Sequence, residues 1–244
     1  MANKPLSAKT RAALSKVSVA TLSTALMKKG FRNVVMQGVL PVAPVGKRRP
    51  NMVGEAFTLR YIPAREDLDV ISGFAGRKHP QRVAVEQCPP GCVFVIDSRK
   101  DPLAASAGNI LVTRLMKRGV AGVVTDGGFR DTPEIADMAI PAYHAGPSAP
   151  TNLIHHHAVD LNVPIACGGV AVYPGDVMVG DGEGVVCLPA HLVEEIAEET
   201  FDQTVYEDFV MERVGQGHTI RGLYPMTDPA NRPLFEAWRK EKGR

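Results

Sequence analysis

An arginine and an aspartate stand side by side just after a glycine-rich turn, at Arg130 and Asp131. The turn, Asp126-Gly127-Gly128, follows the apolar run 120–124, whose length and β-branched residues are typical of a buried strand. A guanidinium can bind a carboxylate through two hydrogen bonds, and a carboxylate oxygen is a ligand that Mg²⁺ accepts. The pair therefore predicts either a binding site for an acid or a surface ion pair that fixes a turn.

Three consecutive segments are predicted to position this pair. Residues 92–97 form a buried strand, 109–118 a helix and 120–125 a second strand. In such a βαβ unit the helix runs antiparallel to both strands, so its first turn lies at their carboxyl ends. The sequence therefore places the free N–H groups of that turn beside Arg130 and Asp131, where they favour an anion.

The helix of this unit has further predicted features. Asn109 is expected to be its N-cap, and basic residues suit its carboxyl end. Its apolar face is expected to consist of Ile110, Leu111, Leu115 and Met116.

The chemistry that fits these parts is that of a 2-oxo acid. Arg130 and the helix start would bind the carboxylate, and a divalent metal on Asp131 would bind the carbonyl oxygen. A metal in that place would stabilise an enolate, the difficult intermediate in breaking a bond next to a pyruvyl group.

The rest of the chain predicts one α/β domain with helices at both ends. We expect a helix over 9–30 that Ser18 or Ser23 divides, a half-buried strand over 52–61 and a short helix around 67–74. Further expected elements are a short strand at 140–144, an interrupted strand over 163–172, two strands within 174–189, and a long helix over 191–215. The predicted division is a domain over residues 1–215 and an extension over 216–244. This extension packs on the same domain or, through Phe235 and Trp238, on a neighbouring subunit.

Composition limits the function classes. The net charge of +2 argues against a nucleic-acid partner or an anionic membrane, and no apolar run approaches the ~20 residues of a membrane span. The cluster Lys47-Arg48-Arg49 is predicted to be a solvated face. The four cysteines lack a metal-binding pattern and are expected to be reduced. Without a secretory signal at the amino end, we expect a cytoplasmic protein.

The run from Gly108 to Asp131 resembles the core of the RraA-like family, which contains the regulator of ribonuclease activity A and class II 4-hydroxy-4-methyl-2-oxoglutarate aldolases. Gly54-Glu-Ala-Phe-Thr58 and the segment 174–189 resemble its flanking motifs. Because the tail is long, the chain resembles a long-form member. The resemblance implies a swivelling-type β/β/α sandwich, assembled as a homotrimer or hexamer with sites between subunits.

The resemblance also implies roles for single residues. Mg²⁺ or Mn²⁺ would be held by Asp131, and Arg130 would bind the pyruvyl carboxylate. The segment that binds the substrate with Arg130 would consist of Gly108, Asn109, Ile110 and Leu111. The aldolase pattern has an acidic residue where this chain has Asn109, which would orient a metal-bound water instead. Proton transfer would then pass to Asp97, Asp101, Asp126 or a water molecule.

Together these features predict a metal-dependent lyase that cleaves 4-hydroxy-2-oxo diacids by a retro-aldol reaction or decarboxylates oxaloacetate. Two alternatives stay open: a non-catalytic, protein-binding regulator of ribonuclease activity, and a dehydratase or isomerase of sugar-derived acids. The internal run His155-His156-His157 and His144 are expected to have structural roles.

Overall fold

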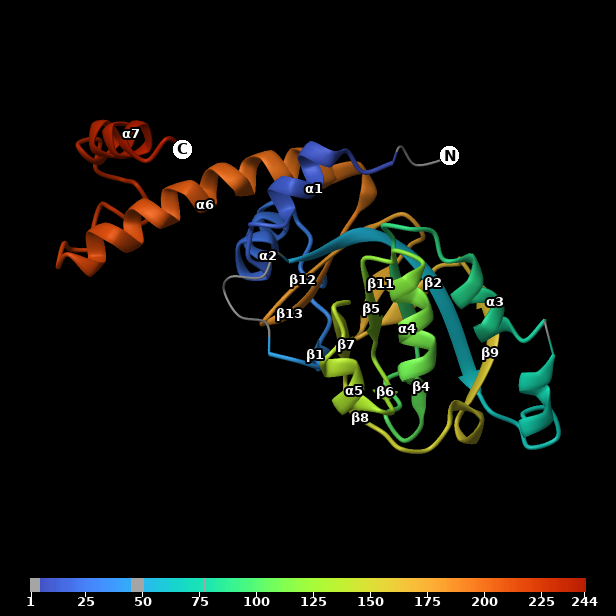
Figure 1. Cartoon of the computed structure of the whole chain (residues 1–244). Helices are drawn as coiled ribbons and strands as arrows, with labels where there is room; N and C mark the ends of the chain where they lie inside the picture. Colours follow the sequence, from blue (N-terminus) through green and yellow to red (C-terminus); the bar gives the residue numbers. More distant parts are fainter. Residues whose placement is uncertain (1–4, 45–50, 77) are drawn as a thin grey trace.

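The computed structural model describes residues 5–44, 51–76 and 78–244, so the predicted face Lys47–Arg49 lies outside the described residues. The described chain is a mixed α/β fold with helices at both ends, as predicted (Figure 1). Its centre is a sheet with the strand order β1-β7-β5-β3-β2-β12-β13, in which β9 also pairs with β2. The strands are β1 (Leu40–Pro41), β2 (Met52–Pro63), β3 (Val93–Asp97), β5 (Gly122–Thr125), β7 (Ala142–His144), β9 (His156–Leu161), β12 (Val177–Asp181) and β13 (Gly184–Leu188).

The long strand β2 joins the two halves of this sheet, and Figure 1 shows it as a long curved arrow. Its first residues pair with β12, its middle pairs in parallel with β3, and its end pairs with β9. The prediction of a half-buried strand is wrong, because core clusters cover both faces: Phe57 belongs to one cluster and Ala56 to another. Gly54 allows a close approach, since a Cβ there would lie 2.5 Å from the Gly91 carbonyl oxygen.

Two small sheets complete the β structure. A parallel sheet contains β4 (Ala105–Ala107), β6 (Gly128–Phe129) and β8 (Gly146–Pro147). The predicted interrupted strand 163–172 is a hairpin of β10 (Ile165–Cys167) and β11 (Val170–Val172). Gly168 and Gly169 make its turn, both with positive φ, which glycine tolerates at little cost.

One predicted division of a helix is confirmed, and one helix is not predicted. The expected helix 9–30 is divided at Ser18, whose side chain accepts a hydrogen bond from the Thr21 N–H and caps the second half. The helix α3, which begins at Pro80, is not among the predicted elements. Its first turn contains Pro80, a position that proline favours. The helices are α1 (Ala8–Leu14), α2 (Val19–Lys28), α3 (Pro80–Gln87), α4 (Asn109–Lys117), α5 (Thr132–Ala136), α6 (Val193–Gly215) and α7 (Asn231–Glu241), with 3-10 turns η1 (Ile71–Ala75), η2 (Asn152–Ile154) and η3 (Ala190–Leu192).

At the carboxyl end, α6 extends beyond the body and α7 lies beside its far end (Figure 1). Phe235 of α7 meets Tyr206 of α6 edge-on with ring centroids 5.2 Å apart, and Trp238 lies 5.8 Å from Phe209. These two aromatic residues therefore cover the chain's own α6. The domain boundary after residue 215 stays a prediction.

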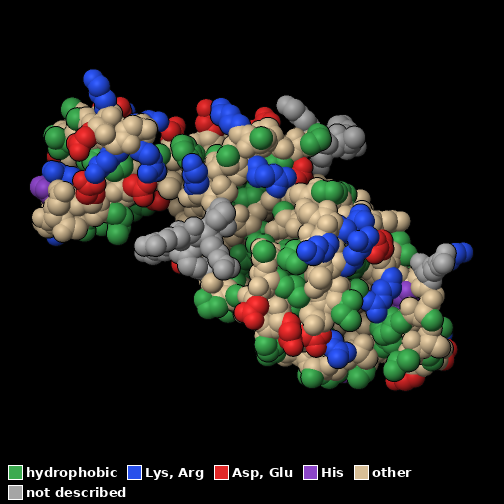
Figure 2. Space-filling model, in the orientation of Figure 1, with side chains coloured by type: hydrophobic (Ala, Val, Ile, Leu, Met, Phe, Trp, Pro, Cys, Tyr) green, Lys and Arg blue, Asp and Glu red, His purple; other side chains and the backbone are tan. Residues whose placement is uncertain are grey.

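The surface and the cysteines agree with the composition. On the face drawn in Figure 2, Lys and Arg side chains are interspersed with Asp and Glu over both the body and the extension. All four cysteines are free, and no helix among the described residues is long and apolar enough to cross a bilayer.

Candidate active site

The βαβ unit forms as predicted. β3 and β5 are parallel neighbours, with Val93 opposite Gly122 and Ile96 opposite Thr125, and α4 connects them. Parallel strands joined by a helix require that the helix begins at the edge where the strands end. The first turn of α4 and the segment after β5 therefore meet at one edge of the sheet.

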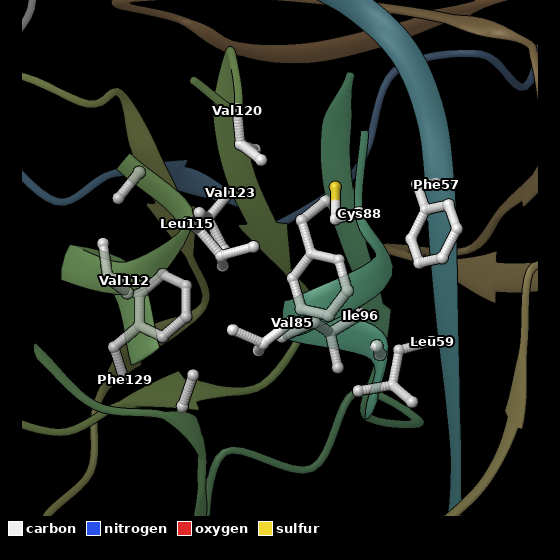
Figure 3. Packing of buried hydrophobic residues seen from close by; sticks show 14 of the residues in the cluster. Phe57, Leu59, Val85, Cys88, Ile96, Val112, Leu115, Val120, Val123 and Phe129 are labelled. Carbon is white, nitrogen blue, oxygen red and sulfur yellow. The ribbon is translucent and has the colours of Figure 1, made fainter. Parts of the chain in front are cut away.

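A short parallel ladder then fixes the contact between them. β4 leads into Gly108 and β6 leads into Arg130, with Ala107 opposite Phe129. The Arg130 N–H donates to the Ala107 carbonyl oxygen at 3.1 Å. Phe129 is fully buried and packs in the same cluster as Val112 of α4; Figure 3 shows the two side chains next to each other. The ladder and this core contact hold the Arg-Asp pair against the helix start.

The helix start differs from the prediction in its cap. The N-cap is Gly108, and Asn109 is the first helical residue. Because glycine has no side chain to satisfy the first N–H groups, they depend on other partners. The Asn109 N–H donates to Asp131 Oδ2 at 3.3 Å, whereas the Ile110 N–H makes no hydrogen bond within the described residues. The helix start therefore keeps a donor for an anion.

The apolar face of α4 also needs a correction. Its fully buried residues are Val112 and Leu115, and the predicted core residue Ile110 is 79% exposed. Leu111 and Met116 are only partly buried against the core. Ile110 and Leu111 instead line the cavity described below.

Asp131 has a left-handed backbone, with φ of 57° and ψ of 40° at the start of α5. This conformation is uncommon for residues other than glycine, although aspartate adopts it more readily than most. Its Oδ2 lies 3.6 Å from Arg130 Nε, too far for a hydrogen bond, and the two side chains are 32% and 47% exposed. Exposed ion pairs of this kind contribute little stability, so turn fixation is a weak reason for the pair.

Arg130 and Asp131 both line a cavity of about 280 Å³. The other predicted site residues, Gly108 to Leu111, line it too, so the structure brings the whole predicted set together. This volume lies just below the range of about 300–1,000 Å³ that is typical of small-molecule sites. The pair therefore lies in the wall of a cavity together with the start of α4, and is not an isolated surface pair.

Two walls of the cavity are not predicted from the sequence. One comes from η1 and α3, and the other from the segment that enters η2. Their residues are Phe74, Gln81, Arg82, Thr151 and Asn152. The guanidinium of Arg82 lies 4.7 Å from the centroid of the Phe74 ring. The signal that the sequence offers for α3 is Pro80 followed by an apolar face, which marks a helix start.

The three aspartates considered for proton transfer lie elsewhere. In the described structure, Asp97, Asp101 and Asp126 do not line this cavity. Asp126 accepts hydrogen bonds from the Ser98, Lys100 and Gly168 amides, and Asp97 accepts from two others. Burial raises the pKa of both Asp97 and Asp126. Their role is to hold loops, which leaves water as the predicted proton carrier.

The histidines have structural partners, as predicted. His156 is buried on β9, stacks on Tyr61 and contacts the Ala104 carbonyl oxygen through Nε2. Its neighbours His155 and His157 pair with aspartates. His144 stacks on the buried residue Phe129, which precedes Arg130, and does not line the cavity. Burial lowers the pKa of both His144 and His156.

The donors around Asp131 allow a test of whether a divalent cation fits. Among the described residues, no group of three or more His, Cys, Asp and Glu side chains is arranged to hold a metal. Asp131 Oδ1 is free of hydrogen bonds within the described structure, and the neutral residue Asn109 lines the same cavity. Mg²⁺ commonly binds through one or two carboxylates while water and substrate supply the remaining ligands. The residues present fit such a cation.

Comparison with known proteins agrees with this fold. The RraA-like family model, described as Aldolase/RraA, matches residues 19–187, which is more than half of the chain. A Halalkalibacterium halodurans protein, provisionally named a 4-hydroxy-4-methyl-2-oxoglutarate aldolase, is 34% identical over 115 residues, covering 47% of this chain and 54% of its own. The 4-hydroxy-4-methyl-2-oxoglutarate aldolase of Thermus thermophilus is 30% identical over 125 residues, covering 48% and 76%. For the first three curated relatives, the match spans between 28% and 54% of their own length.

Solved structures show the same architecture over more of the chain. Streptomyces coelicolor RraAS2, described as an unusual member of the RNase ES inhibitor RraA protein family, superposes with a TM-score of 0.74 at 27% identity and covers 85% of this chain and 98% of its own. An uncharacterised protein from Pseudomonas syringae pv. tomato reaches a TM-score of 0.76 at 23% identity and covers 91% and 99%. The predicted swivelling-type sandwich is therefore confirmed.

Proposed function

The chain belongs to the RraA-like family, and we propose that it is a divalent-metal-dependent lyase acting on a pyruvate-containing 2-oxo acid. Its reaction would be retro-aldol cleavage of a 4-hydroxy-2-oxo diacid or decarboxylation of oxaloacetate. The observation that carries the proposal is the contact between the α4 start and the Arg130-Asp131 pair in one cavity. The aldolase names of its relatives support the reaction class.

In this proposal the residues of the cavity divide the work. Arg130 binds the substrate carboxylate with its N–H groups, and the unpaired Ile110 N–H adds a further donor. Asp131 would hold Mg²⁺ or Mn²⁺, with Asn109 orienting a water molecule beside it. The bound cation would supply positive charge at the carbonyl oxygen, where negative charge develops during bond cleavage.

Proton transfer in this cavity needs a carrier other than a second carboxylate. Within the described wall Asp131 is the sole acidic side chain. Asn109 has no basic group, but its amide can hold a water molecule by donating or accepting a hydrogen bond. We therefore assign the proton to a water molecule that Asn109 positions.

A pyruvate-release assay tests the proposal. Hydroxylated 2-oxo diacids and oxaloacetate are each incubated with protein and Mg²⁺ or Mn²⁺, with EDTA in a parallel reaction. Arg130→Gln is expected to lower kcat/KM by at least about 100-fold, since it removes a charged, bidentate contact. Arg114→Gln is the matched control, because Arg114 pairs with Glu86 on the outer side of α4. Absence of turnover for the whole panel, with metal present, would reject the proposal.

A second function is favoured by one residue. Asn109 replaces the acidic residue of the aldolase pattern, and RraAS2 is described as a member of a ribonuclease-inhibitor family. A regulator would bind a ribonuclease and need no lyase chemistry. Inhibition of RNase E-type cleavage by the purified protein, unchanged in Arg130→Gln, would support this function over the first.

A further inference from the structure

We propose that Arg82 is the residue that binds the second carboxylate of the diacid substrate, and that it sets the preference of the cavity for diacids over simple 2-oxo acids. The inference rests on the proposed function for the position of the first carboxylate, at Arg130. It adds a specificity-determining residue that lies outside the Arg-Asp pair and the helix start.

The position of Arg82 is fixed by its neighbour in α3. Gln81 is 2% exposed, and its Nε2 donates to the Tyr61 hydroxyl at 2.9 Å and to the Ser106 carbonyl oxygen at 2.8 Å. Ser106 belongs to β4, the strand that leads into Gly108. The first turn of α3 is therefore tied to the same strand that positions the helix start, and Arg82 follows directly in the cavity wall.

The guanidinium of Arg82 is free to bind an anion. Within the described residues it has neither an ion pair nor a hydrogen bond, and its contact is with the face of Phe74 at 4.7 Å. Contact with the face of an aromatic ring fixes the orientation of a guanidinium group. It leaves all five N–H donors free to form hydrogen bonds. In contrast, arginines on the outer surface, such as Arg114 and Arg60, pair with carboxylates.

Two residues of the cavity wall each have one buried polar atom without a hydrogen-bond partner in the described structure. Asn152 is 5% exposed, and its Nδ2 has no hydrogen bond in the described structure; the same holds for Oε1 of Gln81. Buried polar atoms are usually paired, and a ligand or a water molecule in the cavity can satisfy these two. Asn152 Nδ2 suits a carboxylate oxygen, and Gln81 Oε1 suits a hydroxyl group.

Charge supports the same assignment. The ionisable side chains of the described cavity wall are Arg82, Arg130 and Asp131, two cations and one carboxylate. A monoanionic ligand bound at Arg130 would leave the Arg82 guanidinium without an anionic partner. A dianionic ligand would supply a partner for both guanidinium groups, which line the same cavity of about 280 Å³.

The test is a binding measurement that needs no turnover. Isothermal titration in Mg²⁺ compares 2-oxoglutarate, which has two carboxylates, with 2-oxobutyrate, which has one; neither has a 4-hydroxyl group to cleave. The wild-type protein is expected to prefer 2-oxoglutarate. Arg82→Gln is expected to weaken 2-oxoglutarate by about 10- to 100-fold and leave 2-oxobutyrate unchanged, as for one lost charged hydrogen-bonding group.

Further variants separate the roles. Arg82→Lys should retain part of the preference, Phe74→Leu should reduce it by about 2- to 5-fold, and Arg130→Gln should weaken both ligands. Arg114→Gln should change neither. Equal binding of the two ligands by wild-type protein, or an equal loss of both in Arg82→Gln, would overturn the inference. If the preference depends on Arg82 but no substrate is cleaved, the lyase proposal fails and this one stands.

Discussion

Gly108→Ala is the sharpest perturbation of the candidate site. The Gly108 backbone is extended, with φ of −127°, so alanine can adopt it without strain. The added methyl carbon would lie 2.8 Å from Arg130 Cγ and 2.8 Å from Asp131 Oδ2, where ordinary contacts begin at 3.4 Å. Arg130 and Asp131 must therefore move away from the helix start.

The expected effects on stability and on function differ in size. Inserting a methyl group into a packed site costs about 1–3 kcal/mol, and the half-exposed Arg130 can swing outward, so we expect the lower end of this range. For a protein of this length, about 1 kcal/mol lowers Tm by roughly 2–4 °C. A displacement approaching 1 Å in a catalytic group can cost about 100-fold in rate, so kcat/KM for pyruvate release should fall by that order.

Gly146→Ala provides the control, because a Cβ at Gly146 meets no atom within 4 Å although β8 belongs to the same small sheet. Both variants are compared by calorimetry and by the pyruvate-release assay. If Gly108→Ala keeps its activity while its Tm falls, close approach of the helix start to the pair is irrelevant to function. An equal loss of activity in Gly146→Ala would show that the small sheet, rather than the contact at Gly108, controls the rate.

Two more predictions concern charge. Burial lowers the pKa of His144 and His156 below 6.5, so the unfolded chain binds more protons than the folded chain between the lowered values and 6.5. The free energy of unfolding in urea should therefore fall as the pH drops below 6.5, and His156→Gln should flatten that dependence; an unchanged slope would contradict the assignment. Asn109→Asp should raise the affinity for Mn²⁺ by about 10-fold, measured by electron paramagnetic resonance titration, because a carboxylate joins Asp131. Equal Mn²⁺ affinity of the wild-type protein and Asn109→Asp would show that residue 109 does not lie near the metal.

The part of the site that the sequence predicts is the part built from neighbouring segments. Residues 92–131 contain two short apolar runs, a helix between them and a glycine turn, and the parallel pairing of β3 with β5 follows from that order. The close contact of Gly108 with Arg130 and Asp131 is a consequence of the same connection. Local patterns and the direction of the crossover helix predict which residues form this half of the cavity, whereas the ladder of β4 and β6 that holds them together is not predicted.

The other half depends on pairings between distant segments. The end of β2 pairs with β9, which brings Asn152 and the segment before β9 to the cavity, and α3 packs on the same strand β9. Nothing in the polar segment 63–79 shows a period that predicts this arrangement. The burial of β2 on both sides is not predictable from its own residues for a similar reason, since its two faces are covered by core clusters from different parts of the chain.

The neutral residue at position 109 and the cation at position 82 have related electrostatic consequences. With Asn109 the described cavity wall has one excess positive charge, whereas an acidic residue there would bring its charge to zero. An excess positive charge opposes binding of a divalent cation and favours a dianionic ligand, and both effects are strong where water is partly excluded. A dicarboxylate bound to Arg82 and Arg130 would reverse the balance and restore attraction for a cation at Asp131. Metal and substrate are therefore expected to bind cooperatively in this chain, with the second carboxylate compensating for the charge that position 109 lacks.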